Sequence, residues 1–170
     1  MPIASVSPDL RRAVLTLSPA PEQEQWCASA AQTLPEAEVD PLQHPIVILA
    51  QDGIPAGFFI LDQNPSPADP SADLMVRALF VDRAYQRHGI GGRALAGLPH
   101  LVRAAVPGAR TVGLTVNIRN PVARDLYLRH GFTDAGELYL GGDAGPQHVL
   151  RLNLTGEPPR AALSSNQDHR

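Results

Sequence analysis

The 170-residue sequence predicts a single domain of the α/β (α+β) class, in which about seven strands form a sheet flanked by about four helices. Two observations support this prediction. Short apolar runs bounded by glycine, proline or aspartate, which are typical of strands, occur along the whole chain. Between them lie longer segments whose apolar residues recur at helical spacing. We expect the domain to span residues 1–154, and residues 155–170, rich in Pro, Ser and charge, to form a disordered tail.

The first half of the chain predicts two helices and three strands. The helices are expected at Pro8–Leu17 and at Glu22–Leu34, the second because its apolar residues have helical spacing. Asp52-Gly53 separates two apolar runs and is typical of a hairpin turn. The expected strands are Ile3–Val6, Ile46–Ala50 and Ala56–Leu61.

The second half predicts a loop, two helices and four strands. Three prolines in residues 62–73 exclude regular structure there. Helices are expected at Gly89–Ala105 and Pro121–His130. Pro99 lies inside the first of them, where a proline lowers the stability of a helix by about 3 kcal/mol. This helix therefore either kinks there or ends near Gly97 and restarts. The expected strands are Leu74–Val81, Thr111–Val116, Phe132–Leu140 and His148–Leu154.

Composition limits the classes of protein to which the chain can belong. Its pI is about 6.0, whereas nucleic-acid-binding domains are usually basic, so we expect no nucleic-acid partner. No apolar run approaches the roughly 20 residues of a membrane helix, and residues 11–17 are too short for a signal peptide. We therefore expect a cytoplasmic protein with no membrane contact. The one cysteine, Cys27, suits a reducing compartment; we interpret it as a small apolar helix residue, and we expect no metal site.

One glycine-rich segment has the features of an anion-binding site. Residues 86–91 read Gln-Arg-His-Gly-Ile-Gly and lie between an expected strand and an expected helix. Glycines leave backbone N–H groups uncovered, and the first turn of a helix supplies unpaired N–H donors and the positive end of its dipole. Arg87 and His88 are adjacent. The segment therefore predicts a binding site for a phosphate or pyrophosphate.

The charges around this segment point the same way. Between Arg83 and Arg124 there is no Asp or Glu, but there are seven arginines. This segment carries +7 and the rest of the chain −10, which together give the net charge of −3. We expect the segment to face a polyanion and the remainder to attract cations. The seven are Arg83, Arg87, Arg93, Arg103, Arg110, Arg119 and Arg124.

Two other phosphate-binding motifs fit less well. Gly89–Ala94 matches the G-x-G-x-x-A pattern of dinucleotide-binding folds. In those folds the first glycine follows the strand almost at once, and an acidic residue about 20 positions later binds the ribose. Here seven residues separate Val81 from Gly89, and the next acid after Asp82 is Asp125. The chain has no lysine, which excludes a P-loop as well as Schiff-base and pyridoxal chemistry.

A second motif predicts a short helix with defined ends. Asn120 is a favourable N-cap and Pro121 suits the first helical position. Gly131 is expected to cap the other end. Residues three and four apart lie on one face of a helix. Those that share a face here are Ala123, Leu126 and Tyr127.

With both motifs, the chain from roughly Ile3 to Leu154 resembles the GCN5-related N-acetyltransferase (GNAT) superfamily. The order of the expected elements matches as well. The resemblance implies a mixed, mostly antiparallel sheet, and it is nearest to the small-molecule amine acetyltransferases of the diamine and polyamine type. The motifs that carry it are Gln86-x-x-Gly89-x-Gly91 and Asn120-x-x-Ala123-x-x-Leu126-Tyr127-x-x-x-Gly131-Phe132.

The resemblance implies acetyl-CoA as the co-substrate and gives roles to particular residues. The backbone of Leu79, Phe80 and Val81 would pair with the pantetheine arm like an additional strand, and one of its N–H groups would lie near the thioester carbonyl. Such a donor stabilises an oxyanion by roughly 3–4 kcal/mol in other acyl-transfer sites. Asn120 would contact the pantetheine. The loop implied to hold the pyrophosphate begins with Gln86 and continues through Arg87, His88, Gly89, Ile90, Gly91 and Gly92.

Tyr127 is the candidate general acid. A phenol with a pKa of about 10 remains protonated at neutral pH and can donate its proton to the departing thiolate. The alternative is a packing residue whose hydroxyl is hydrogen-bonded.

The general base is less well defined. An alkylamine with a pKa of about 10.4 is only about one part in a thousand neutral at pH 7, so a base is needed. Family members that acetylate protein N-termini commonly carry a glutamate at the position of Thr115, which cannot serve. A water chain or an acid from another loop would replace it. Other candidates are Asp73, Glu137 and His148, and a structural role is equally open for the histidine.

The acceptor is expected to be a small-molecule amine. The acidic surplus includes Glu36, Glu38 and Asp40, which would attract a cationic amine such as a polyamine; a solvated helix end is the alternative. Activity on protein N-termini, and a module that binds acetyl-CoA without catalysis, remain open as rival functions. A homodimer is compatible with the sequence.

Overall fold

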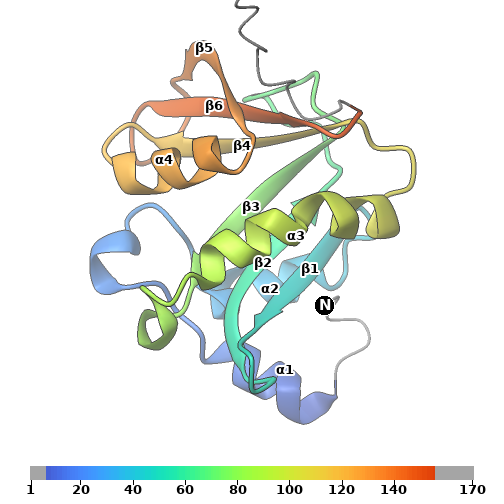
Figure 1. Cartoon of the computed structure of the whole chain (residues 1–170), viewed down its shortest axis with the longest axis vertical. Coiled ribbons are helices and arrows are strands. Elements are labelled where there is room, and N and C mark those ends of the chain that lie inside the picture. Colours follow the sequence, from blue (N-terminus) through green and yellow to red (C-terminus); the bar gives the residue numbers. More distant parts are fainter. Residues whose placement is uncertain (1–6, 156–170) are drawn as a thin grey trace, which may run out of the picture.

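The computed structural model describes residues 7–155, in which one six-stranded sheet runs through the molecule (Figure 1). The strand order is β1-β2-β3-β4-β6-β5. The strands are β1 (Gln43–Leu49), β2 (Pro55–Asp62), β3 (Leu74–Val81), β4 (Thr111–Asn117), β5 (Thr133–Tyr139) and β6 (Gln147–Asn153). The helices are α1 (Pro8–Leu15), α2 (Ala30–Ala37), α3 (Ile90–Ala105) and α4 (Pro121–Arg129), with short 3-10 turns η2 (Pro21–Gln23) and η3 (Arg83–Tyr85).

The sheet is mixed and mostly antiparallel, as predicted. Only β3 and β4 are parallel, and they pair at just two positions, Leu74 with Val112 and Met75 with Gly113. All other neighbours are antiparallel. Six of the seven expected strands are present, and the seventh, Ile3–Val6, lies outside the described residues, as do residues 156–170 of the expected tail.

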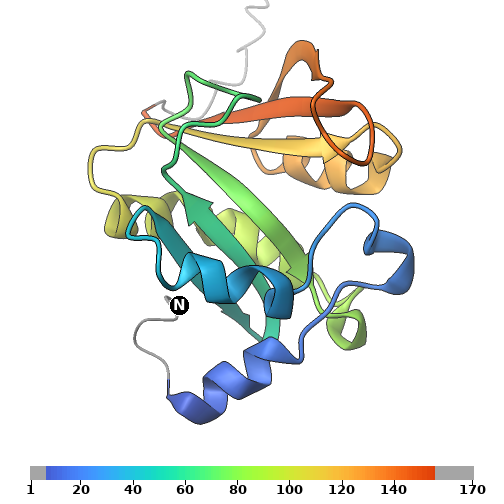
Figure 2. The ribbon, with the colours of Figure 1, turned by 180° about the vertical axis from the view of Figure 1, so that it is seen from behind.

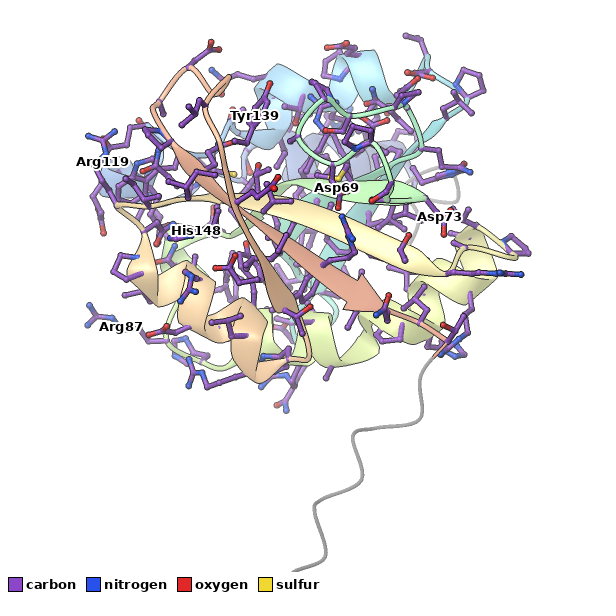
Figure 3. All side chains as sticks on the ribbon, turned by 90° about the horizontal axis from the view of Figure 1, so that it is seen from above. Asp69, Asp73, Arg87, Arg119, Tyr139 and His148 are labelled. Atoms are coloured by element: carbon purple, nitrogen blue, oxygen red, sulfur yellow. The ribbon has the colours of Figure 1, made fainter. Side chains whose placement is uncertain are left out.

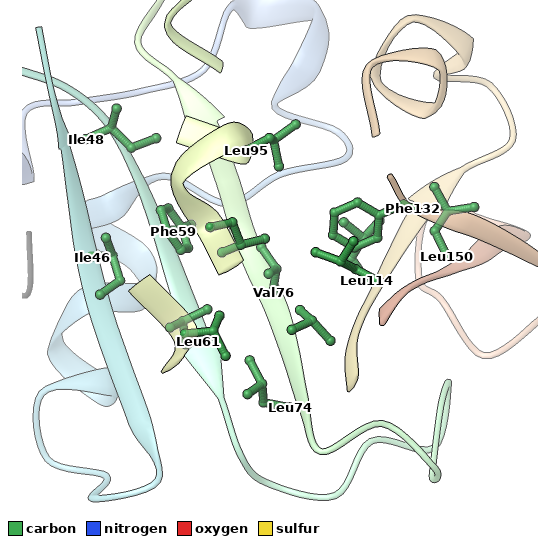
Figure 4. Close-up of a cluster of buried hydrophobic side chains, with 14 of the residues drawn as sticks. Ile46, Ile48, Phe59, Leu61, Leu74, Val76, Leu95, Leu114, Phe132 and Leu150 are labelled. Carbon is green, nitrogen blue, oxygen red and sulfur yellow. The ribbon is translucent and has the colours of Figure 1, made fainter. Parts of the chain in front are cut away.

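Helices cover both faces of the sheet (Figures 1 and 2). On one face α3 and α4 pack over a core that draws residues from every strand except β5 (Figure 4). On the other face α1 and α2 cover a smaller cluster that includes Phe58, Ile60 and Phe80. Burial of these apolar side chains is the main favourable term that holds the layers together.

The predicted helix at Glu22–Leu34 is wrong. The chain instead forms η2, then a turn, and α2 begins only after Ser29. The N–H of Ser29 donates to the Gln32 side chain at 2.8 Å, a local bond of the kind that starts a helix and competes with helical structure before it. Helical spacing of the apolar residues could not detect this start.

The predicted helix around Pro99 is continuous. It runs from Ile90 to Ala105, so the alternative in which it ends near Gly97 is wrong. Leu98 and Val102 lie on either side of the proline and are fully buried. Their packing offsets the backbone hydrogen bond that proline removes.

Two predicted connections are confirmed. Asp52-Gly53 forms the turn between β1 and β2, with Gly53 at φ 80°. Residues 63–73 form an irregular loop.

Among residues 7–155, no helix is long and apolar enough to cross a membrane, and no cluster of three or more His, Cys, Asp or Glu in this range could hold a metal ion.

Gly57 is the position where the β2–β3 pair tolerates least change. A Cβ there would lie 2.6 Å from the backbone oxygen of Phe80. We predict that Gly57→Ala lowers the free energy of unfolding by about 1–3 kcal/mol, because the clash is with backbone. Urea denaturation measures it. Gly97→Ala is the control: its Cβ meets nothing within 4 Å, and alanine in a helix should raise stability by about 0.5–1 kcal/mol. Equal effects of the two substitutions would contradict the prediction.

Candidate functional site

The site lies in a cleft of about 1160 Å³ between the carboxyl-terminal parts of β3 and β4. Because β3 and β4 pair only at their first residues, the two strands separate beyond Met75. No strand of the described chain pairs with that edge of β3 from Val76 to Val81, so its backbone groups there are available to a ligand. Residues 76–81 all line the cleft.

A bulge interrupts β3 inside the cleft. The register between β2 and β3 shifts between Phe58 and Ile60, and Ala78 has a φ of 52°. A bulge leaves one residue without its ladder partner and re-aims the backbone. A positive φ is strained for alanine, and such strain tends to occur at functional sites. The bulge thus changes the direction of the backbone at Ala78 and Leu79, both of which line the cleft.

The glycine-rich loop forms one end of the cleft. Gly89 is the N-cap of α3 and has a φ of 71°, and Arg87 has a φ of 66°. The first amides of α3, at Ile90, Gly91 and Gly92, have no earlier helical carbonyl to bond. Among the described residues the Arg87 side chain has no hydrogen-bond partner, and unpaired amides with a cation beside them are an arrangement that can bind a pyrophosphate. The amides of Ile90, Gly91 and Gly92 together with Arg87 are called the seat below.

The glycines also have a packing role that the sequence did not reveal. A Cβ on Gly92 would lie 3.3 Å from Nε2 of His130, and one on Gly91 would lie 3.5 Å from the Leu126 side chain. Small residues at these two positions therefore let the start of α3 approach α4. The loop is held in place by Gln86, whose Nε2 donates to the Val81 carbonyl at 3.0 Å and to Gln23 Oε1 at 2.8 Å.

Most residues predicted to bind the co-substrate do meet at this cleft. All but one line it, although Phe80 and Ile90 are largely buried. Asn120 caps α4, as predicted, by accepting from the Ala123 N–H at 3.3 Å. His88 does not line the cleft; its Nδ1 lies 3.3 Å from the Tyr85 carbonyl. The lining residues that were predicted are Leu79, Phe80, Val81, Gln86, Arg87, Gly89, Ile90, Gly91, Gly92, Asn120 and Tyr127.

The expected field of seven arginines is largely absent from the cleft, because most of these side chains bind protein oxygens. Arg93 donates to His88, Arg103 to Leu154, Arg119 to Ala144 and Arg124 to Asp134. Arg87 alone of the seven lines the cleft, and it stands clear of the ribbon (Figure 3). The charge count therefore overestimated the electrostatic contribution of this segment.

Tyr127 and Cys27 lie together in the cleft near the bulge. Burial of the Tyr127 hydroxyl raises its pKa above the usual value, and the nearby Cys27 raises it further. No residue of the described chain hydrogen-bonds this hydroxyl, and its ring packs on Phe132 with 5.9 Å between centroids. The phenol is thus protonated and available to a ligand.

Cys27 is not on a helix, contrary to prediction. Its Sγ lies 3.6 Å from the carbonyl oxygens of Leu79 and Ala28. Burial raises the pKa of the thiol to about 12, so at neutral pH it is protonated and can donate to the bulged strand. No pattern in the sequence predicts that Cys27 contacts Leu79, which lies 52 positions later in the chain.

The opposite end of the cleft is lined by polar residues. Glu36 and Asp40 come from the end of α2 and the turn after it. The Leu42 N–H and the Asn64 side chain donate to Asp40 and hold the pKa of its carboxyl below the usual value. Asn64 also donates to the buried Asp62, which binds Arg77 at 2.5 Å. This end of the cleft, comprising Glu36, Asp40, Asp62, Asn64, Arg77 and residues 65–68, is called the acceptor end below.

An ion pair with a buried carboxylate fixes the proline-rich loop over the acceptor end. Asp69 is 3% exposed and binds Arg151 of β6 through both carboxylate oxygens, at 3.0 and 2.6 Å. Burial alone would raise the pKa of Asp69, but the hydrogen bonds from Arg151 and Ser71 lower it overall. The pair ties residues 63–73 to the half of the sheet beyond the cleft.

None of the three candidates for the general base reaches the cleft, whereas Thr115, which cannot act as a base, lines it. Asp73 accepts the backbone N–H groups of Arg110 and Thr111 at 2.7 and 2.9 Å, and it lies on the other side of the molecule from Arg87 (Figure 3). His148 Nδ1 lies 3.5 Å from Asp134. Neither these residues nor Glu137 line the cleft; the carboxylates that do are Glu22, Glu36, Asp40 and Asp62.

Comparison with known proteins agrees with this geometry. The Acetyltransferase (GNAT) family profile matches residues 10–132. The chain belongs to the GNAT family. It is therefore an acyl-CoA-dependent N-acyltransferase, and acetyl-CoA is its co-substrate.

Individual relatives of this GNAT protein extend the comparison. The uncharacterized N-acetyltransferase YbbJ of Bacillus subtilis (strain 168) is 31% identical over 112 residues, which cover 64% of this chain and 69% of that protein. Aminoglycoside 6'-acetyltransferase type Ii superposes with a TM-score of 0.64 at 19% identity, over 89% of this chain and 94% of that one. A chimera of spermidine N-acetyltransferase SpeG from Vibrio cholerae and hSSAT gives 0.64 at 14% identity, over 88% and 92%.

One further solved structure holds the co-substrate. It is a putative streptothricin acetyltransferase from Bacillus anthracis str. Ames, in complex with acetyl coenzyme A. Its TM-score with this chain is 0.54 at 18% identity, over 70% of this chain and 66% of that one. At such identities the two solved structures above and this one establish a shared fold.

Proposed function

We propose that this GNAT enzyme acetylates the primary amine of a small cationic acceptor. The observation that carries the proposal is the polarity of the cleft, which has an amide-rich seat at one end and carboxylates at the other. Asp40 is held ionised by its hydrogen bonds, and Glu36 is exposed and without a partner among the described residues. Anions placed this way attract an ammonium group. Spermidine, streptothricin and aminoglycosides, named in three structural relatives, are all amines.

The proposed reaction joins the two ends of the cleft. The amine nitrogen attacks the thioester carbonyl carbon, the new C–N bond forms and the C–S bond breaks. The departing thiolate takes a proton from Tyr127, and the proton that the nitrogen gives up as the amide forms restores the phenol, so the products are the amide and the free thiol. Backbone N–H groups on the free edge of β3 stabilise the charge that develops on the carbonyl oxygen. Asp62 is committed to Arg77 and Asn64, and Glu36 and Asp40 hold the acceptor's positive charge. Glu22 is then the lining carboxylate left to accept the ammonium proton.

Replacing Tyr127 tests whether the cleft catalyses as well as binds. We predict that Tyr127→Phe lowers kcat about 100- to 10 000-fold, because the thiolate loses its proton donor. Thiol release from acetyl-CoA measures the rate, and calorimetry should give unchanged affinity for coenzyme A. An unaltered kcat would assign Tyr127 to packing against Phe132 alone.

Replacing Glu36 tests the cationic acceptor. We predict that Glu36→Gln raises KM for a diamine roughly two- to fivefold, because an exposed charge pair is lost. Glu38→Gln is the matched control: Glu38 binds Arg11 at 2.7 and 2.5 Å and does not line the cleft, so KM should not change. The same assay with neutral amines, anionic amines and a peptide completes the test. Activity confined to these acceptors would refute the proposed function.

A further inference from the structure

The acceptor end contains a cation as well as carboxylates. Arg77 interrupts the apolar sequence of β3 and lines the cleft, two residues before Leu79. Its side chain is 53% exposed. The other residues of β3 are apolar and Arg77 adds nothing to their packing, so its place in the cleft calls for another explanation.

The single contact of Arg77 leaves most of its donors free. A guanidinium has five N–H donors, and among residues 7–155 Arg77 uses only Nη1, which donates to Asp62 at 2.5 Å. Asp62 is otherwise satisfied, since its second oxygen accepts the backbone N–H and the side-chain amide of Asn64 at 2.9 and 2.8 Å. The Asp62 carboxylate therefore holds the Nη1 atom of the guanidinium and leaves the N–H groups of Nε and Nη2 open. These N–H groups are called the open edge below.

Two other arginines of this protein show what a purely structural pair looks like. Arg11 binds Glu38, and Arg151 binds Asp69, each through Nε and Nη2 onto both carboxylate oxygens. That two-bond arrangement is the usual geometry of an arginine–carboxylate pair. Arg77 departs from it, because it binds the buried Asp62 through Nη1 alone. Arg12 and Arg124 also bind a carboxylate through one nitrogen, but of these three arginines only Arg77 lines the cleft. The open edge of the guanidinium matches a second carboxylate, supplied by a ligand.

We propose that the acceptor is a diamino carboxylic acid, a molecule of the lysine or ornithine type. Its carboxylate binds the open edge of Arg77, and its distal ammonium binds Glu36 and Asp40. Its other amino group, after losing a proton, gains the acetyl group through a new C–N bond, while the carboxylate and the second ammonium stay unchanged. This inference rests on the proposed acetylation of a small cationic amine and narrows it, because a simple diamine leaves Arg77 unused.

The test compares two acceptors that differ only in the carboxylate, lysine and 1,5-diaminopentane. We expect the wild-type enzyme to have a kcat/KM for lysine about ten- to a hundredfold above that for the diamine, the effect of a charged two-bond contact. In Arg77→Gln this preference should disappear, and the readout is the ratio of the two kcat/KM values, because the substitution also uncovers Asp62 in the cleft for both acceptors. Arg77→Lys, which keeps a charge beside Asp62 but lacks the planar fork, should lose most of the preference.

Thermal unfolding of both variants shows whether a loss of activity comes from misfolding. If Arg77→Gln is unstable, Arg77→Lys still tests the inference. The inference is overturned if the wild-type enzyme prefers the diamine or treats the two acceptors equally, or if a folded variant loses activity on both to the same extent. In those cases acetylation of the diamine still supports the proposed function. Absence of activity on either acceptor overturns the inference, and the wider amine panel then decides the proposed function separately.

Discussion

The short parallel pairing of β3 with β4 is the constraint on which the site depends. Only Leu74 and Met75 of β3 pair with β4, and the strands then separate, so the free edge of β3 and the first turn of α3 face the same cleft. A longer pairing would bond that edge into the sheet and close the space. Arg151 of β6, which binds Asp69 across this junction, holds the two halves of the sheet where they still meet.

Much of the fold follows from local sequence signals. The bounds of β3 were predicted without error, because Leu74–Val81 is an apolar run between a proline-rich loop and Asp82. Asn120 and Pro121 gave the start of α4, and Asp52-Gly53 gave the first hairpin. These signals work because caps and turns depend on steric contacts and hydrogen bonds between residues that are close in the sequence. The start of α2 was missed, because the Ser29–Gln32 bond outweighs helical spacing before it.

The parts of the site that could not be predicted depend on register and on distant segments. Asp62 meets Arg77 because of the register of β2 on β3, in which Asp62 lies opposite Met75 and Ile60 opposite Arg77. Cys27 reaches Leu79 across 52 positions. Charge counting failed at residues 83–124 for a related reason: whether an arginine faces a ligand or a protein carbonyl depends on tertiary contacts, as Arg103 and Arg119 illustrate.

The two ends of the cleft thus use different groups to bind ligands. One end offers the backbone amides at the start of α3, and the acceptor end offers charged side chains. The central claim is that the free edge of β3 and the start of α3 bind acetyl-CoA. Hydrogen–deuterium exchange tests it most directly. Adding coenzyme A should slow exchange at the amides of residues 76–81 and 89–92 and leave the β1–β2 hairpin unchanged. Unchanged exchange at both segments under saturating coenzyme A would contradict the account.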